Sequence, residues 1–237
     1  ATIGGPARLP ECPPVSSAIV LRLAALVLAY VLTLGRAEAS VPFDPHVPLL
    51  PADVRLPRWE AARAELARDL PVLAACLADA ARCTSEPQRG WRRMMHAARD
   101  LDGHAQRAAV NAFLNQAPYR RDADRHGVVD HWSGPIGFLE AGGDCEDYAI
   151  AKYASLRLLG VPASALRIVV LEDRRRNLAH AVLAVLDGTR VWVLDNQQGE
   201  VRPIDTLPHY DPYYAVNEEQ RWLHRIPGQP AATASAR

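Results

Sequence analysis

The sequence predicts an α+β fold in which a helical N-terminal part packs against an antiparallel sheet. Apolar residues recur at helix spacing from residue 58 to about residue 117. A further helical segment begins at about residue 145, and three strand-like runs follow it, at 166–172, 180–186 and 190–195. We expect this later helix to lie on the sheet that the strands form.

Length and charge narrow the possible functions. The chain has 237 residues, and 49% of them are hydrophobic, as in an ordinary globular protein. Its 27 basic and 27 acidic residues balance, so it lacks the basic footprint that nucleic-acid-binding proteins normally carry. Because no linker interrupts residues 58–224, we interpret this stretch as one domain.

The first 39 residues have the layout of a secretory signal peptide. An uncharged apolar run of about 12 residues, Leu23 to Leu34, follows Arg8 and Arg22, and the A-x-A pattern of a cleavage site follows at 37–39. The run is short for a membrane span, which needs roughly 20 apolar residues. We therefore expect an exported protein, with an uncleaved N-terminal membrane anchor as the alternative.

Residues 40–57 are rich in proline and predict an extended linker before the domain. In the helical part that follows, we expect the first helix to break at Pro71. Core packing is the expected role of its apolar positions, which are Trp59, Ala62, Leu66, Leu70, Leu73 and Leu77, and of a later stripe, Val110, Phe113, Leu114 and Ala117. The glycine-rich stretch 118–143 predicts loops, and residues 225–237 predict a disordered tail.

The cysteines divide into a pair and a single residue. Cleavage of the signal peptide would leave Cys76, Cys83 and Cys145, and the first two are close enough in sequence to pair in an oxidising compartment. Cys145 is then the odd cysteine of an exported protein. An ordinary unpaired cysteine is a small buried hydrophobe, but acidic neighbours make burial of Cys145 in an apolar core unexpected.

Cys145 lies in the first turn of the later helix, in the segment GGDCEDYA. Asp144 is a favourable N-cap residue, and Gly160 ends the helix. A helix N-terminus favours a thiolate, whereas nearby carboxylates raise the pKa of a cysteine. If Cys145 is a nucleophile, another group must offset these negative charges.

A predicted hairpin supplies a base and an acceptor for it. A two-residue turn at Asp187 and Gly188 would place His180 directly opposite Asp195, within reach of an imidazole–carboxylate hydrogen bond. Together with Cys145, this pair predicts a Cys-His-Asp triad. A bulged three-residue loop would shift the register by one residue, and each residue taken alone reads as an ordinary strand-end side chain.

Three segments, GGDCEDYAIAKYASLRLLGVP, LRIVVLEDRRRNLAHAVLAVLDG and VWVLDNQ, resemble the bacterial transglutaminase-like cysteine proteases. The resemblance covers roughly residues 58–224. It implies a papain-like core and an endopeptidase that forms a thioester on Cys145. It also implies two oxyanion donors: the backbone N–H of Cys145 and, by analogy with transglutaminases, the indole N–H of Trp132, for which a core or lid role is the alternative.

The resemblance implies a calcium site beside the nucleophile. The matching positions are Asp144 and Glu146, with Asp147 as a third ligand and backbone carbonyls from the 115–121 loop as further candidates. A bound dication would reverse the local potential, so that the Cys145 thiolate is favoured. From the residues alone, these acids read as complements to the helix dipole.

The resemblance further implies a periplasmic enzyme that cuts a large surface adhesin near its N-terminus, at a di-alanine site, and so controls biofilm attachment. Its implied partner is the periplasmic domain of a cyclic di-GMP receptor of the LapD type. Two other functions stay open. The same triad can pass the acyl group to an amine, as in a transglutaminase, or the scaffold can be a catalytically idle module that binds calcium or a partner.

Overall fold

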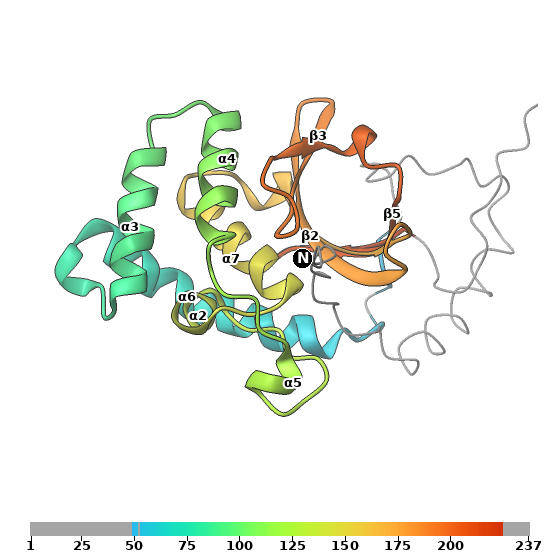
Figure 1. Cartoon of the computed structure of the whole chain (residues 1–237), viewed down its shortest axis with the longest axis horizontal. Helices are drawn as coiled ribbons and strands as arrows, with labels where there is room; N and C mark the ends of the chain where they lie inside the picture. The colour runs from blue at the N-terminus through green and yellow to red at the C-terminus, as the bar shows by residue number, and fades with distance from the viewer. Residues whose placement is uncertain (1–48, 52, 225–237) are drawn as a thin grey trace, which may run out of the picture.

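Helices and strands gather on opposite sides of the molecule, which confirms the predicted α+β class (Figure 1). The computed structural model describes residues 49–51 and 53–224. Its helices are α2 (Pro57–Ala78), α3 (Glu86–Ala98), α4 (Gly103–Leu114), α5 (Asp122–Arg125), α6 (Pro135–Ala141) and α7 (Cys145–Leu158), with short 3₁₀ turns at Ala80–Arg82, Ala163–Ala165 and Ile204–Thr206. The predicted signal peptide, residues 1–39, and the predicted tail, residues 225–237, lie outside the described residues.

Helix α2 runs without interruption through Pro71, so the predicted break is wrong. Proline removes one backbone N–H and crowds the carbonyl four residues earlier, which here belongs to Ala67. Both Pro71 and Ala67 are exposed, so the carbonyl left without its helical partner faces water. The opposite face of the helix keeps its bonds and buries Leu66 and Leu73. A break at Pro71 would therefore expose the buried face of the helix. It would restore a hydrogen bond only to a carbonyl that already faces water.

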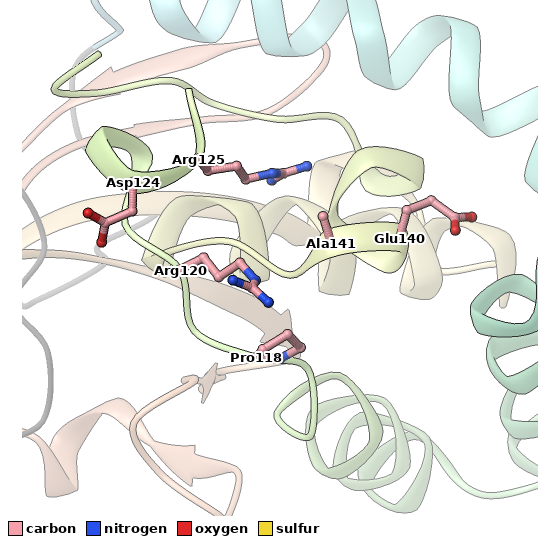
Figure 2. A pocket seen from close by; sticks show the side chains of 6 residues that line it. All are labelled: Pro118, Arg120, Asp124, Arg125, Glu140 and Ala141. Carbon is pink, nitrogen blue, oxygen red and sulfur yellow. The ribbon is translucent and has the colours of Figure 1, made fainter. Parts of the chain in front are cut away.

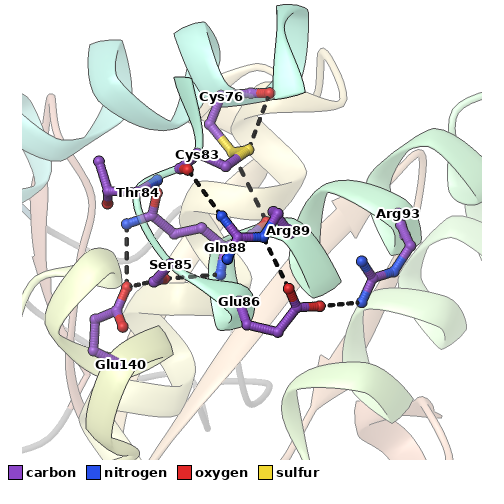
Figure 3. Close-up of polar contacts among 9 residues, drawn as sticks. All are labelled: Cys76, Cys83, Thr84, Ser85, Glu86, Gln88, Arg89, Arg93 and Glu140. Atoms are coloured by element: carbon purple, nitrogen blue, oxygen red, sulfur yellow. Dashed lines mark hydrogen bonds and ion pairs between the residues drawn. A yellow bond between two sulfur atoms is a disulfide. The ribbon is translucent and has the colours of Figure 1, made fainter. Parts of the chain in front are cut away.

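The start of α3 is linked to the helices α2 and α6 (Figure 3). Cys76 at the end of α2 forms a disulfide with Cys83, a pairing that the sequence allowed but did not decide. Ser85 caps α3 by accepting a hydrogen bond from the backbone N–H of Gln88 at 3.3 Å, and its hydroxyl donates to Glu140 of α6. Gln88 also donates to Glu140, at 3.1 Å. These contacts hold α2, α3 and α6 as one helical layer.

The strands form a single six-stranded sheet in the order β4-β3-β2-β1-β5-β6, with every neighbouring pair antiparallel. Their bounds are β1 (Leu166–Asp173), β2 (Leu178–Asp187), β3 (Arg190–Leu194), β4 (Arg202–Pro203), β5 (Tyr210–Val216) and β6 (Arg221–Leu223). The first three confirm the strand-like runs of the sequence. Alternate residues of β2 enter two separate apolar clusters, Leu183 on the helical side and Val182 on the other.

The hairpin between β2 and β3 has a different register from the predicted one. Asp187 pairs with Arg190, so the two-residue turn consists of Gly188 and Thr189. The ladder places Leu183 opposite Leu194, and the predicted pairing is therefore displaced by two residues. Side chains along a strand alternate between the two faces of the sheet with a period of two. A displacement of two residues therefore leaves His180 and Asp195 on one common face, as predicted. Gly188 adopts a φ of 59°, which favours glycine and sets the turn where it is.

Helix α7 is the centre of the fold, because it packs on β1 and β2 and is covered by α2, α4 and α6 (Figure 1). Every residue from Cys145 to Leu156 is buried, and these include Glu146, Asp147 and Lys152. The helix ends at Leu158, two residues before the predicted stop residue Gly160, which has a φ of 95°. Burial of several charged side chains on one helix is unusual and directs attention to its N-terminal end.

The described end of the predicted linker packs on the domain. Leu49 forms an isolated antiparallel bridge with Trp222, and the backbone N–H of Leu50 donates to Arg221 at 2.9 Å. Leu50, Val54 and Leu56 are buried, and α2 begins at Pro57. Among the helices of residues 49–51 and 53–224, none is both long and apolar enough to cross a membrane.

Candidate active site

The first turn of α7 is held by the loop that precedes α5. Tyr119 pairs with Gly143 in a parallel bridge, and the backbone N–H of Arg120 donates to Gly143 at 2.9 Å. Gly142 has a φ of 73°, and a Cβ there would lie 2.0 Å from the Pro118 carbonyl oxygen. A Cβ on Gly143 would lie 2.1 Å from Asp147 Oδ2. The two glycines therefore allow the loop and the helix start to approach closely.

Cys145 is the first residue of α7 and is buried. Its Sγ lies 3.1 Å from Oε2 of Glu146, and its side chain packs against Ala181 of β2. Ala181 directly follows His180, so the cysteine lies beside the strand that carries the predicted base. Cys145 is thus buried between a carboxylate and a small apolar side chain, outside the two large apolar clusters of the fold.

His180 and Asp195 form the predicted pair. Nε2 of His180 lies 2.9 Å from Oδ1 of Asp195, and both side chains are buried. Burial alone would raise the pKa of Asp195, but the adjoining His180 and hydrogen bonds from Tyr210 and Gln197 outweigh it and hold that pKa well below its usual value. The carboxylate is therefore ionised and fully hydrogen-bonded at neutral pH.

The loop that carries Asp195 is held from α4 by two asparagines. Nδ2 of Asn115 donates to the backbone oxygens of Asp195 at 2.9 Å and Gln198 at 3.0 Å. Asn111, one turn earlier, donates to Gln198 at 3.1 Å. Neither residue was predicted from the sequence. Two asparagines spaced i and i+4 beside an apolar helix face do indicate that their side chains face the interior.

Five carboxylates crowd the other side of the α7 N-terminus. Two groups place one carboxylate oxygen from each member within 4.8 Å of the others: Asp122, Asp130 and Glu146 in one, and Asp122, Asp144 and Asp147 in the other. The structure thus brings together the three predicted metal ligands and adds Asp122 and Asp130. Nothing in their spacing identified these two, because Asp122 begins the four-residue α5 and Asp130 lies in the loop that follows it.

Several oxygens of this acidic cluster have no donor. Within this cluster, the buried carboxylate oxygens without a hydrogen bond to a described residue are Oδ1 of Asp122, both oxygens of Asp144, Oε1 of Glu146 and Oδ2 of Asp147. Arg125 offers partial compensation at 3.6 Å from Asp147, and the backbone N–H of Ser133 donates to the same residue at 2.7 Å. A hard cation with several oxygen ligands fits this donor set.

The cluster disfavours its own negative charge. Burial raises the pKa of Asp144 to about 7. Burial, and then the charges of Asp144 and Asp147, raise the pKa of Glu146 well above its ordinary value. Burial followed by the charge of Asp144 does the same for Asp147. Without a cation, these side chains compete with one another for protons.

Comparison with known proteins agrees with this arrangement. Residues 72–225 match the family of bacterial transglutaminase-like cysteine proteinases. The chain belongs to this family. LapG of Legionella pneumophila shares 27% identity and a TM-score of 0.56, over 66% of this chain and 86% of that chain. A calcium-bound structure of the same protein shares 30% identity with a TM-score of 0.55, over the same shares of the two chains. A search of curated proteins found no match.

The contacts of two residues in this member of the family do not support roles that the sequence suggested for them. Asp144 occupies the N-cap position of α7 but makes no capping hydrogen bond, because its carboxylate turns into the acidic cluster. The indole N–H of Trp132 donates to Asp130 at 3.0 Å, and its ring packs edge-on against Trp59 at 6.3 Å. The N–H is thereby committed, so the contacts favour the alternative core role of Trp132 over the oxyanion role.

A hollow of 410 Å³ lies on the outer side of the loop that holds α7. Its lining residues are Pro118, Arg120, Asp124, Arg125, Glu140 and Ala141. Figure 2 shows the Arg120 and Arg125 side chains among those that line it. Arg125 also donates to the backbone oxygens of Gly142 and Gly137, each at 2.8 Å. These hydrogen bonds show that Arg125 stabilises the loop before α7. We assign no ligand to the hollow.

Proposed function

We propose that this member of the family is an exported, calcium-dependent cysteine endopeptidase. Cys145 is the nucleophile, His180 the general base and acid, and Asp195 the group that orients the imidazole. The observation that carries the proposal is the buried 2.9 Å contact between His180 and Asp195 on the strand that packs against Cys145. Family membership supports the cysteine protease chemistry.

The geometry gives the two ring nitrogens of His180 different roles. Nε2 is bonded to Asp195, so proton exchange with Cys145 falls to Nδ1. Reduced Cys145 gives its proton to His180, and Sγ attacks the carbonyl carbon of the scissile peptide. The C–N bond breaks, the imidazolium protonates the leaving amine, and a thioester stays on Cys145. Water, deprotonated by His180, then hydrolyses the thioester and restores the thiol.

The backbone N–H of Cys145 is the proposed oxyanion donor. It lies in the first turn of α7, where helix N–H groups have no partner within the helix. The positive end of the helix dipole also favours the negative charge that develops on the carbonyl oxygen during attack.

The residues of the acidic cluster are the proposed calcium ligands. Asp144, Glu146 and Asp147 supply the core of the site, and Asp122 supplies an additional oxygen. Asp130 lies at the edge, because it is already paired with Arg58 at 2.8 Å. Bound calcium would replace the negative potential beside Cys145 with a positive one, which favours the thiolate. The calcium-bound structure of Legionella LapG supports this choice of metal.

We further propose the periplasm as the site of action and a large surface adhesin as the substrate, cut near its N-terminus at a di-alanine site. The regulator is the periplasmic domain of a cyclic di-GMP receptor of the LapD type, and the result is control of biofilm attachment. Similarity to LapG supports this assignment.

The test uses residues 40–237, kept reduced, and an adhesin fragment from the same genome that carries an Ala-Ala linker. Intact masses of the products are measured with calcium, with a chelator, and with Cys145→Ala. Two fragments that need both calcium and Cys145 support the proposal. Cleavage in the chelator would contradict the calcium requirement, whereas amine incorporation without cleavage would identify acyl transfer.

A further inference from the structure

Tyr210 lies at the start of β5, two strands away from β2, yet reaches the triad. In the sheet order β2-β1-β5, it pairs with Asp173 of β1. Its side chain is buried, and its ring stands edge-on to the imidazole of His180, with ring centroids 6.1 Å apart at an interplanar angle of 67°. No part of the mechanism above uses this residue.

The two oxygens of Asp195 have different partners. Oδ1 contacts His180 and accepts the backbone N–H of Gln197 at 2.8 Å. Oδ2 accepts a hydrogen bond from the hydroxyl of Tyr210. The oxygen of that hydroxyl in turn accepts a hydrogen bond from Nε2 of Gln198, at 3.4 Å. Because an ionised carboxylate only accepts, the phenol must be the donor. Hydrogen bonds therefore converge on Asp195 from two sides, from Gln198 through Tyr210 on one oxygen and from His180 on the other.

Removal of the hydroxyl would leave Oδ2 of Asp195 buried without this donor. Such a carboxylate can rotate and exchange its oxygens, and the imidazole would lose its fixed orientation. We propose that Tyr210 is a positioning residue for the peptidase reaction, acting on His180 through Asp195. This inference rests on the proposed function, and it adds a fourth member to the machinery that function requires.

A simpler role must be separated from this one. The Tyr210 ring also belongs to the apolar cluster on the far face of the sheet, with Val169 and Val182 among its members. Tyr210→Phe keeps the ring and removes only the hydroxyl, so it isolates the proposed contact. Tyr213→Phe is the matched control, because that hydroxyl, on the same strand, donates to Glu172 at 2.9 Å instead of to the triad.

The first measurement is peptidase activity of residues 40–237 with the adhesin fragment. We expect Tyr210→Phe to lower kcat about tenfold or more, as for loss of a hydrogen bond to a charged group, with little change in KM. Tyr213→Phe should retain the parent kcat. Equal losses in the two variants, or a change confined to KM, would overturn the proposal.

The second measurement is a double-mutant cycle with Asp195→Asn. If Tyr210 acts through Asp195, Tyr210→Phe has no further effect on kcat in the Asp195→Asn background. A second tenfold loss there would show that Tyr210 acts independently of Asp195 and would contradict the inference.

The third measurement needs no substrate. Alkylation of Cys145 by iodoacetamide, in saturating calcium and at one neutral pH, is followed by peptide mass and reports how readily the thiolate reacts. We expect Tyr210→Phe to slow this alkylation, whereas Tyr213→Phe should react at the parent rate. An unchanged rate in Tyr210→Phe would refute the role of Tyr210. If parent alkylation is fast but no adhesin is cut, the proposed substrate fails and Tyr210 can still be judged.

Discussion

The two ends of the candidate site are equally buried but differ in how their charges are compensated. His180 and Asp195 are each 1% exposed, and Asp144 and Glu146 are 0% and 4% exposed. Both oxygens of Asp195 accept hydrogen bonds, whereas both oxygens of Asp144 lack a donor among the described residues. Native proteins rarely bury polar atoms without partners, because each one costs free energy.

The difference separates the part of the site that the protein completes by itself from the part that needs a ligand. The triad side is closed by side chains from β2, the loop after β3, the C-terminal end of α4 and β5, so its order should not depend on metal. The acidic cluster has an excess of acceptors that a bound cation would satisfy. The experiments below break one side at a time and ask whether the other side responds.

Loss of the triad carboxylate should have the largest effect. In Asp195→Asn the side chain keeps its size but loses the charge that stabilises the imidazolium, and we expect kcat to fall about 10³- to 10⁴-fold. The increase in Tm caused by calcium should stay as in the parent. Asp187→Asn, a change in an exposed carboxylate of the same hairpin, serves as the control. Residual activity within tenfold of the parent would remove Asp195 from the triad.

Changing the acidic cluster should give effects of opposite sign with and without calcium. Glu146→Gln removes a buried acid whose ionisation is disfavoured in the folded cluster but not in the unfolded chain, so near neutral pH without calcium we expect it to raise the stability by about 1–3 kcal/mol. With calcium it removes a ligand, so the variant should be less stable than the parent. Urea unfolding in chelator and in calcium measures both values. Asp124→Asn, in an exposed ion pair with Arg121, should respond equally in the two conditions.

The predicted contact between His180 and Asp195 is present, although the strand register from which it was predicted is wrong. The predicted hairpin turn was wrong, and Val182 rather than His180 aligns with Asp195 when the ladder is extended beyond Leu194. The error equalled one period of the strand, so His180 and Asp195 kept a common face. The side chains then bridge the diagonal separation, which is about 7–8 Å between backbones. A displacement of one residue would have separated them.

The acidic cluster was predictable only in part. Asp144, Glu146 and Asp147 are consecutive or nearly so, and their closeness to Cys145 is visible in the sequence. Asp122 and Asp130 join them through loop folding, and this depends on the close approach of Gly142 and Gly143 to the 118–122 segment. Such approach is a tertiary property with no local pattern. The same limitation hid Tyr210, which reaches Asp195 from β5.

The stabilisation by calcium should depend on pH. The folded-state pKa of Asp144 is raised to about 7, above its unfolded value near 4, so the folded protein holds more protons in this window. Without calcium, stability therefore falls as pH rises from about 4 to about 7. Calcium replaces those protons, so its effect on Tm should be larger at pH 8 than at pH 5. An equal shift at both pH values would mean that calcium binds elsewhere.

Lys152 is a third case, because it is a buried charged residue on α7 that belongs neither to the triad nor to the acidic cluster. It is the single lysine of the sequence, and its Nζ has no hydrogen-bond partner among the described residues. Nζ lies 5.7 Å from the centroid of the Tyr148 ring. Burial lowers the pKa of Lys152 to about 7, although Asp195 partly opposes this.

The sign of its effect on stability follows from that pKa. Between about 7 and the unfolded value of 10.5, the unfolded chain binds more protons, so stability rises with pH across this window. Below about 7 the folded protein bears the full cost of burying an ammonium. We expect Lys152→Met to stabilise the protein by about 1–3 kcal/mol at pH 6, with a smaller gain at pH 9, in urea unfolding. Destabilisation at both pH values would mean that Asp195 compensates Lys152 fully, so that the triad side of the site includes this lysine as well.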